Sequence, residues 1–90
     1  MTNATDILEE AIKIVTGPRR GSYGEPAVSF QRIATLWEPV LGRSVEPWQV
    51  ALCLAQLKVA RIVNNPLERD SWTDLAGYSA LGAEVAGVIQ

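Results

Sequence analysis

Residues 67–84, LERDSWTDLAGYSALGAE, combine a charged beginning with a run of small side chains. The first half of this stretch holds a tryptophan and four charged residues: Glu68, Arg69, Asp70, Trp72 and Asp74. Asp70 or Ser71 suits the start of a helix, because short polar side chains accept hydrogen bonds from the free N–H groups of the first turn. We therefore expect a last helix that begins there and carries the small-residue run.

The small-residue run weakens this helix when it is considered alone, since each glycine costs up to about 1 kcal/mol relative to alanine. Its members are Ala76, Gly77, Ser79, Ala80, Gly82, Ala83, Ala86 and Gly87. Small side chains let another backbone approach closely, and that backbone belongs either to the same chain or to a second subunit. The sequence leaves both alternatives open. A chain of 90 residues has a thin core, which association would extend.

A first helix is predicted near the start of the chain by apolar residues at helical spacing. Asp6 and Glu9 suit its N-terminus, and Gly17 with Pro18 ends it. Its expected buried stripe is Ile7, Leu8, Ala11, Ile12 and Val15.

Two further helices are predicted between this one and the last. One begins near Pro26 and closes at Gly42, and Pro39 predicts a kink or an early end because proline breaks the hydrogen-bond ladder. The other begins at Pro47 and is apolar on most sides until Lys58, so we expect it to be the central helix. The expected buried residues of the two helices are Phe30, Ile33, Ala34, Trp37, Val40, Leu41, Trp48, Val50, Ala51, Leu52, Leu54, Ala55, Leu57, Val59 and Ile62.

The connections between these helices are short to medium in length, which favours antiparallel neighbours. The expected fold class is therefore all-α. We expect one compact four-helix domain over residues 1–90, with antiparallel helix hairpins and with oligomerisation through its helices.

Composition excludes several classes of function. The chain is 48% hydrophobic and 20% charged, with a net charge of −2, which argues against binding of long nucleic acids. It has no histidine, which excludes Ser-His-Asp and Cys-His catalysis, and its one cysteine, Cys53, lies in an apolar run and is expected to be buried. No apolar run is long enough to span a bilayer, and the beginning MTNATDILEE has no signal-peptide character. We expect a cytoplasmic protein with no membrane partner.

A polar cluster is predicted where the last two helices fold back on each other. Residues equally far from their loop then face each other, which places Lys58 near Asp74 and Arg61 near Asp70 or Trp72. Two interpretations are open. The cluster is either a set of interhelical salt bridges that fix the helix register, or a ligand or metal pocket at the same place.

The segment RRGSYG, residues 19–24, offers two guanidinium groups, a phenol and backbone amides in a glycine-containing loop. Arginine suits phosphate oxygens, and glycine allows close approach to a ligand. The phosphate-binding patterns GxGxxG and GxxxxGK[ST] are both absent, and the alternative is a surface loop whose arginines pair with Glu25 or Glu9. Trp37 and Trp48 are expected in the core, whereas Trp72 could instead line a pocket and stack on a base.

The order SYGEPAVSFQRIATLW, LKVARIV and RDSWTDLAGYSAL resembles a family of small phage and prophage proteins of unknown function. The resemblance covers roughly residues 8–86. That family is in turn distantly similar to nucleotide-modification-associated domains and to the all-α, MazG-like nucleotide pyrophosphatases. The resemblance implies a compact helical domain, often oligomeric, with a nucleotide-type ligand.

Magnesium binding follows only from the resemblance to the pyrophosphatases, which hold Mg²⁺ with E-x-x-E and E-x-x-D carboxylates. This sequence departs from that pattern. Glu38 stands without a second glutamate, and Asp70 and Asp74 are four residues apart, so Asp74 alone fits. If the chain is an enzyme, Glu38, Asp70 and Asp74 would hold the ion, with Glu10 as a further candidate.

The function that we predict is binding of a nucleotide or nucleotide-derived signal without chemistry, which could sequester a host defence signal. No catalytic residue and no cofactor are expected, and a homo-oligomer is. The candidate ligand-binding residues are Arg19, Arg20, Tyr23, Gly24, Lys58, Arg61, Arg69, Trp72 and Tyr78. Two alternatives are a magnesium-dependent nucleotide pyrophosphohydrolase and a structural or protein-interaction module.

Overall fold

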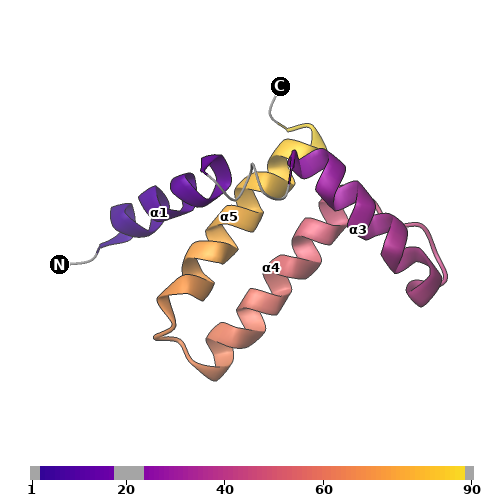
Figure 1. Ribbon diagram of the computed structural model, residues 1–90. Helices are drawn as coiled ribbons and strands as arrows, with labels where there is room; N and C mark the ends of the chain where they lie inside the picture. Colours follow the sequence, from indigo (N-terminus) through magenta and orange to yellow (C-terminus); the bar gives the residue numbers. More distant parts are fainter. Residues whose placement is uncertain (1–2, 18–23, 89–90) are drawn as a thin grey trace.

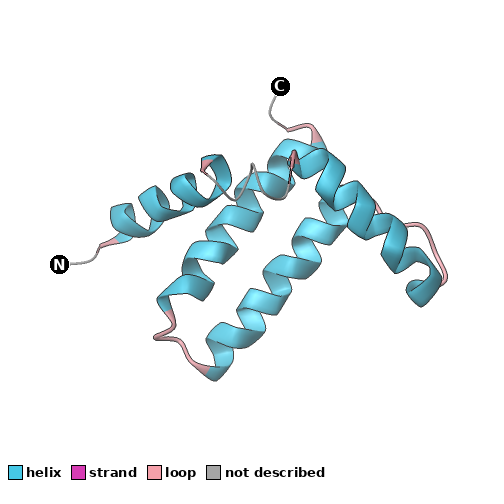
Figure 2. Cartoon of the chain, in the orientation of Figure 1, coloured by secondary structure: helices cyan, strands magenta, loops and turns pink. Residues whose placement is uncertain are grey.

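The computed structural model describes residues 3–17 and 24–88, and within these ranges it contains four α-helices and no strand (Figures 1 and 2). The helices are α1 (Ala4–Thr16), α3 (Pro26–Leu41), α4 (Pro47–Asn64) and α5 (Arg69–Ala86). The predicted all-α fold class is therefore confirmed for the part of the chain that is described.

The helix ends follow the local chemistry of the sequence. Asn3 caps α1, because its side chain accepts a hydrogen bond from the Asp6 N–H at 3.2 Å while the Asp6 carboxylate accepts one from the Asn3 N–H at 3.1 Å. Pro26 and Pro47 stand at the first positions of α3 and α4, where a missing N–H costs nothing. Gly42 ends α3 in the left-handed region, with φ at 71°, which glycine adopts without strain.

Pro39 does not end α3, so the expected early end is wrong. The helix continues to Leu41, and the Gly42 N–H then donates to the Glu38 carbonyl at 2.8 Å. Because Pro39 lies in the last turn, its missing N–H removes one bond close to where the ladder stops in any case.

The helix in contact with all three others is α5, not the third predicted helix, which is α4. The loop of residues 65–68 joins α4 to α5, and the two helices lie side by side in Figure 1, with α1 against α5 and α3 across the beginning of α4. A Cβ atom placed on Gly82 would lie 3.2 Å from the Ala51 Cβ, and one on Gly77 would lie 3.6 Å from the Val15 Cγ1. At these two glycines the close neighbour therefore belongs to the same chain.

The core is small and lies where α3, α4 and α5 meet. Phe30, Ala34, Val50 and Ala51 form its buried centre. The half-buried residues packed around that centre are Ile33, Trp37, Val45, Leu54, Tyr78, Leu81 and Val85. The expected core positions of Phe30, Ala34 and Val50 are confirmed, and Trp37 packs at the edge of the core.

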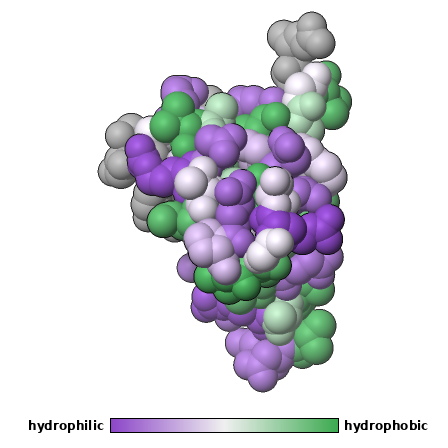
Figure 3. All heavy atoms as spheres, turned by 90° about the vertical axis from the view of Figure 1, so that its right-hand side faces the viewer, coloured by the Kyte–Doolittle hydropathy of each residue, from purple (hydrophilic) through white to green (hydrophobic). Residues whose placement is uncertain are grey.

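Several apolar residues that were expected to be buried are instead exposed. Trp48 is 40% exposed, and Cys53 is exposed as well. The others are Leu8, Ile12, Val40, Leu41, Leu52, Leu57 and Val59. Helical spacing shows which residues share a face, but it does not show whether anything covers that face. Apolar residues also reach the surface on the side viewed in Figure 3.

Candidate functional site

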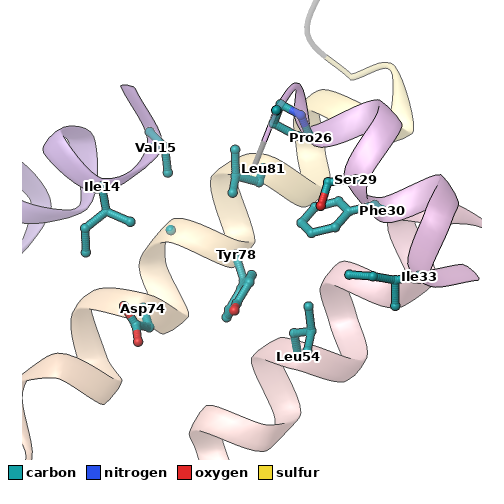
Figure 4. A pocket seen from close by; sticks show the side chains of 12 residues that line it. Ile14, Val15, Pro26, Ser29, Phe30, Ile33, Leu54, Asp74, Tyr78 and Leu81 are labelled. Atoms are coloured by element: carbon teal, nitrogen blue, oxygen red, sulfur yellow. The ribbon is translucent and has the colours of Figure 1, made fainter. Parts of the chain in front are cut away.

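A pocket of about 360 Å³ lies between the helices, and all four contribute to its wall (Figure 4). Its lining residues are Ile14, Val15, Gly24, Pro26, Ser29, Phe30, Ile33, Leu54, Asp74, Gly77, Tyr78 and Leu81. The pocket exists because α1 and α3 both pack near the later part of α5, and the missing side chain of Gly77 leaves room between α1 and α5.

Among the described residues, the wall of the pocket is apolar apart from three side chains. Ser29 offers a hydroxyl, Tyr78 a phenol and Asp74 a carboxylate. In Figure 4 Tyr78 points from α5 into the space between α5 and α4, into which Leu54 also points from α4. Together with Phe30, Tyr78 gives the pocket an aromatic side, and flat rings pack well against such surfaces. Among the described residues of the wall Asp74 alone is charged, and its carboxylate can accept hydrogen bonds from N–H donors.

Asp74 also joins α5 to α4. Its Oδ2 lies 3.1 Å from the Lys58 Nζ, as the counting of residues from the loop predicts. The two side chains are only 14% and 16% exposed, so water screens this ion pair far less than a surface pair. The salt-bridge interpretation and the pocket interpretation are therefore compatible at Asp74, because one carboxylate both pairs with Lys58 and borders the pocket.

Arg61 was expected near Asp70 or Trp72, and the ion pair that it forms is with Glu68, the residue two positions before Asp70. The Arg61 Nη2 lies 2.9 Å from the Glu68 Oε1, which also accepts a hydrogen bond from the Ser71 hydroxyl at 2.8 Å. Glu68 is the last residue of the loop, and from there it can reach back to α4. The contact closes the loop and is away from the pocket wall.

Trp72 lies in the first turn of α5 and contacts the same loop rather than the pocket. Its indole N–H donates a hydrogen bond to the Pro66 carbonyl at 2.8 Å, and Trp72 is absent from the wall. The structure therefore does not place Trp72 in the wall of this pocket, which was one of the two positions predicted for it.

Arg69 holds α1 against α5. Its guanidinium donates to both carboxylate oxygens of Glu10, and Thr73 donates to the same carboxylate at 3.1 Å. These hydrogen bonds from Arg69, the largest cause, and from Thr73 lower the pKa of Glu10 below its ordinary value of 4.5. Arg69 therefore serves a contact between helices, and it does not line the pocket.

Of the residues predicted to bind a ligand, Gly24 and Tyr78 line the pocket, and Lys58 reaches its edge through Asp74. Arg19, Arg20 and Tyr23 lie outside the described residues.

The carboxylates of the magnesium alternative do not come together. In residues 3–17 and 24–88, no group of three or more acidic, cysteine or histidine side chains is arranged to hold a metal ion. This corrects the expectation that Glu38, Asp70 and Asp74 converge. Glu38 is near the end of α3, and Asp70 is an exposed residue in the first turn of α5, away from the pocket.

Most of the pocket wall was not foreseen as a site. The residues that sequence patterns missed are Ile14, Val15, Pro26, Ser29, Phe30, Ile33, Leu54, Gly77 and Leu81. Val15, Phe30, Ile33 and Leu54 were expected in the core, because apolar residues at helical spacing look the same whether they surround a void or fill it.

None of the helices in the described ranges is long and apolar enough to cross a bilayer.

Comparison with known proteins places the chain in a phage context. A family model described as "Domain of unknown function (DUF6378)" matches residues 6–86. The Gene 55 protein of Mycobacterium phage D29 is 38% identical over 73 residues, which cover 81% of this chain and 48% of that protein. The Gene 55 protein of Mycobacterium phage L5 is 39% identical over 77 residues, which cover 83% of this chain and 49% of that protein. No solved structure matches the chain.

These matches confirm the expected resemblance to a small phage family of unknown function. The similarity to MazG-like pyrophosphatases stays a prediction. The chain spans about half the length of the curated relatives it matches.

Proposed function

The chain belongs to the DUF6378 family, and from this premise we propose that it binds a nucleotide-type small molecule by its base, without a chemical step. The site is the pocket between the four helices, and the binding takes place in the cytoplasm of the bacterial host. Capture of such a molecule would withdraw a signal from the host cell, as the phage context suggests.

The observation that supports this proposal is the apolar lining of the pocket. Its volume of about 360 Å³ lies at the lower end of the range for small-molecule sites, about 300–1,000 Å³, and leaves room for a heteroaromatic ring. Phe30 and Tyr78 offer aromatic surface to such a ring. Asp74 borders the same space, and a carboxylate accepts hydrogen bonds from ring or exocyclic N–H groups.

The phosphates of the ligand stay outside the pocket. In the described part of the wall an anion would meet mostly apolar side chains, which disfavour it, and the one lining charge, Asp74, already faces Lys58. The described cations that were expected to neutralise phosphates already face carboxylates: Lys58 faces Asp74, Arg61 faces Glu68 and Arg69 faces Glu10. The proposal therefore keeps the predicted ligand class and reverses its orientation, with the base inside.

The pyrophosphohydrolase alternative has less support, because the described residues provide no cluster of three carboxylates. An interaction module is favoured by a separate observation, the exposed apolar side chains of α4, and that role is compatible with ligand binding.

The proposal is tested by capture followed by identification. The purified protein is incubated with extract of phage-infected cells, washed and denatured, and the released compounds are identified by mass spectrometry. Titration calorimetry then compares the compound with its free base and with inorganic phosphate. We expect the released compound to contain a purine or pyrimidine ring, and we expect the free base to bind while phosphate does not.

A matched pair of variants on α3 assigns the binding to the pocket. Ser29→Phe places a ring in the pocket, whereas Val28→Phe places the same ring on the adjacent surface position, where Val28 is 58% exposed. Capture should be lost in the first variant and kept in the second, while circular dichroism reports equal helix content. Capture of no compound by the unmodified protein, or full capture by Ser29→Phe, would refute the proposal.

A further inference from the structure

We propose that two copies of this chain form a symmetric dimer through one side of the α4–α5 pair. We call this side the α4–α5 face and define it by Trp48, Leu52 and Val59 of α4 with Ala76, Ser79 and Ala83 of α5. The proposal does not rest on the ligand pocket, and it goes beyond the proposed function.

Helix geometry gathers these residues on one side. Successive residues of a helix are turned by about 100°, so Trp48, Leu52 and Val59 lie within about 40° of one another. Ala51, which meets Gly82 of α5, is turned by about 60° or more from each of them. Leu54, which lines the pocket, lies beyond Ala51 in the same sense of rotation. The stripe on α4 therefore lies on the side of the α5 contact that is remote from the pocket.

The stripe on α5 follows in the same way. Ala76, Ser79 and Ala83 lie within about 60° of one another, and Gly82 separates them from Tyr78 in the pocket wall. On each of the two helices, the line of contact between α4 and α5 lies between the stripe and the pocket. Both stripes therefore face the same side of the helix pair. Gly77, which contacts Val15 of α1, is turned by about 100° or more from each of the three residues in the α5 stripe and lies on the other flank of α5.

The α4–α5 face carries apolar side chains and no charged ones. Trp48 is 40% exposed, Leu52 56% and Val59 36%, whereas the two charged residues of α4, Lys58 and Arg61, face Asp74 and Glu68. A contiguous apolar surface of this kind on a soluble chain marks a contact with a partner.

A second copy fits this face because its two halves are complementary. The large side chains of α4 form a ridge, and the small side chains of α5 form a shallow groove beside it. A twofold axis through the face would set the ridge of each copy in the groove of the other, which is the self-complementary arrangement of a symmetric dimer. Trp48, Leu52, Ala55 and Val59 are also spaced alternately four and three residues apart, the spacing of helices that pack as coiled coils.

The size of the face is adequate for a stable dimer. Both helices have 18 residues, so each is about 27 Å long, and two adjacent helices are about 20 Å wide. The projected area is therefore about 540 Å². Two copies together would contribute about 1,080 Å², which is just above the roughly 1,000 Å² that a specific interface should reach and below the standard size of about 1,600 Å².

The test measures molar mass by light scattering or sedimentation on the full chain at about 100 μM, well above the dissociation constant of an ordinary specific complex. We expect twice the mass of one chain. Leu52→Glu should give monomers because it places a carboxylate in the centre of the face, whereas Leu36→Glu should remain dimeric, since Leu36 is a 66% exposed residue of α3 outside the face.

Ser79→Phe separates specific docking from general stickiness. The variant adds apolar surface, so nonspecific association would increase, whereas a ring in the groove should exclude the ridge of the second copy and give folded monomers. Circular dichroism confirms that each variant keeps its helices. A monomeric unmodified chain, as expected if a further segment of a longer protein covers the face, would overturn the proposal, and so would dimers of both Leu52→Glu and Ser79→Phe.

Discussion

Substituting alanine for each of two glycines in α5 tests how closely this helix is packed. Gly77 and Gly82 are both helical, so the gain in helix propensity is the same for both substitutions, about 1 kcal/mol. Their surroundings differ. A Cβ on Gly77 would lie 3.6 Å from the Val15 Cγ1, an ordinary contact, whereas a Cβ on Gly82 would lie 3.2 Å from the Ala51 Cβ, which is tight.

The two variants should therefore differ in stability. Gly77→Ala keeps the full gain, which in a domain of this size raises the melting temperature by about 4–8 °C. At Gly82 the neighbour cannot turn aside, because Ala51 is 1% exposed and its Cβ moves only with the backbone of α4. Overpacking of this kind costs about 1–3 kcal/mol, which cancels or exceeds the gain. We expect Gly82→Ala to be no more stable than the unmodified chain.

The assay is reversible urea or thermal unfolding followed by circular dichroism at one protein concentration, because dimerisation makes the melting temperature depend on concentration. The comparison is internal, since each variant controls for the propensity change of the other. Equal stabilisation by the two substitutions would mean that α4 and α5 are further apart than the Ala51–Gly82 contact implies. The reasoning about close packing would then be refuted.

Three further substitutions test individual contacts. Lys58→Met should lower stability by about 2 kcal/mol in urea unfolding, because it removes the ammonium from a mostly covered ion pair with Asp74. Adding Asp74→Leu should restore most of the loss. No loss in the single variant would show that the ion pair is dispensable. The lowered pKa of Glu10 means that its contact with Arg69 stabilises the fold fully above about pH 4.5 and less as the pH falls through the folded pKa. Glu10→Gln should therefore flatten the acid side of a plot of melting temperature against pH, and an unchanged plot would contradict this. Pro39→Ala should raise the unfolding free energy by about 1–3 kcal/mol, because it restores an N–H to α3. An unchanged melting temperature would contradict this prediction.

Helix positions could be predicted from the sequence because they depend on local chemistry. Pro26, Gly42 and Pro47 fix the helix ends whatever the rest of the chain does. The contact between Lys58 and Asp74 could also be predicted, since it needs only a count of residues from the loop between two neighbouring helices.

The partner of Arg61 could not be predicted by the same count, because it depends on the path of the loop. The loop places Glu68 close to α4, where it meets Arg61 before Asp70 can. The pocket escaped prediction for a different reason. Whether Leu54 fills space or borders a void depends on how three other helices pack around it, and no pattern along one helix contains that information.

The contrast within residues 67–84, between a charged beginning and the small residues that follow, is explained by the contacts that α5 makes. Charged residues at its beginning fix it to its surroundings: Arg69 binds Glu10 of α1, and Asp74 binds Lys58 of α4. Once α5 is fixed, its later part passes close to α4, and Gly82 allows this where a larger side chain would push the two helices apart, whereas Gly77 stands at an ordinary contact distance from α1. A helix that contacts all three others cannot carry large residues on every side. The small residues that remain exposed on α5 are therefore left beside the large exposed residues of α4, and the dimer that we propose would pair this groove with this ridge.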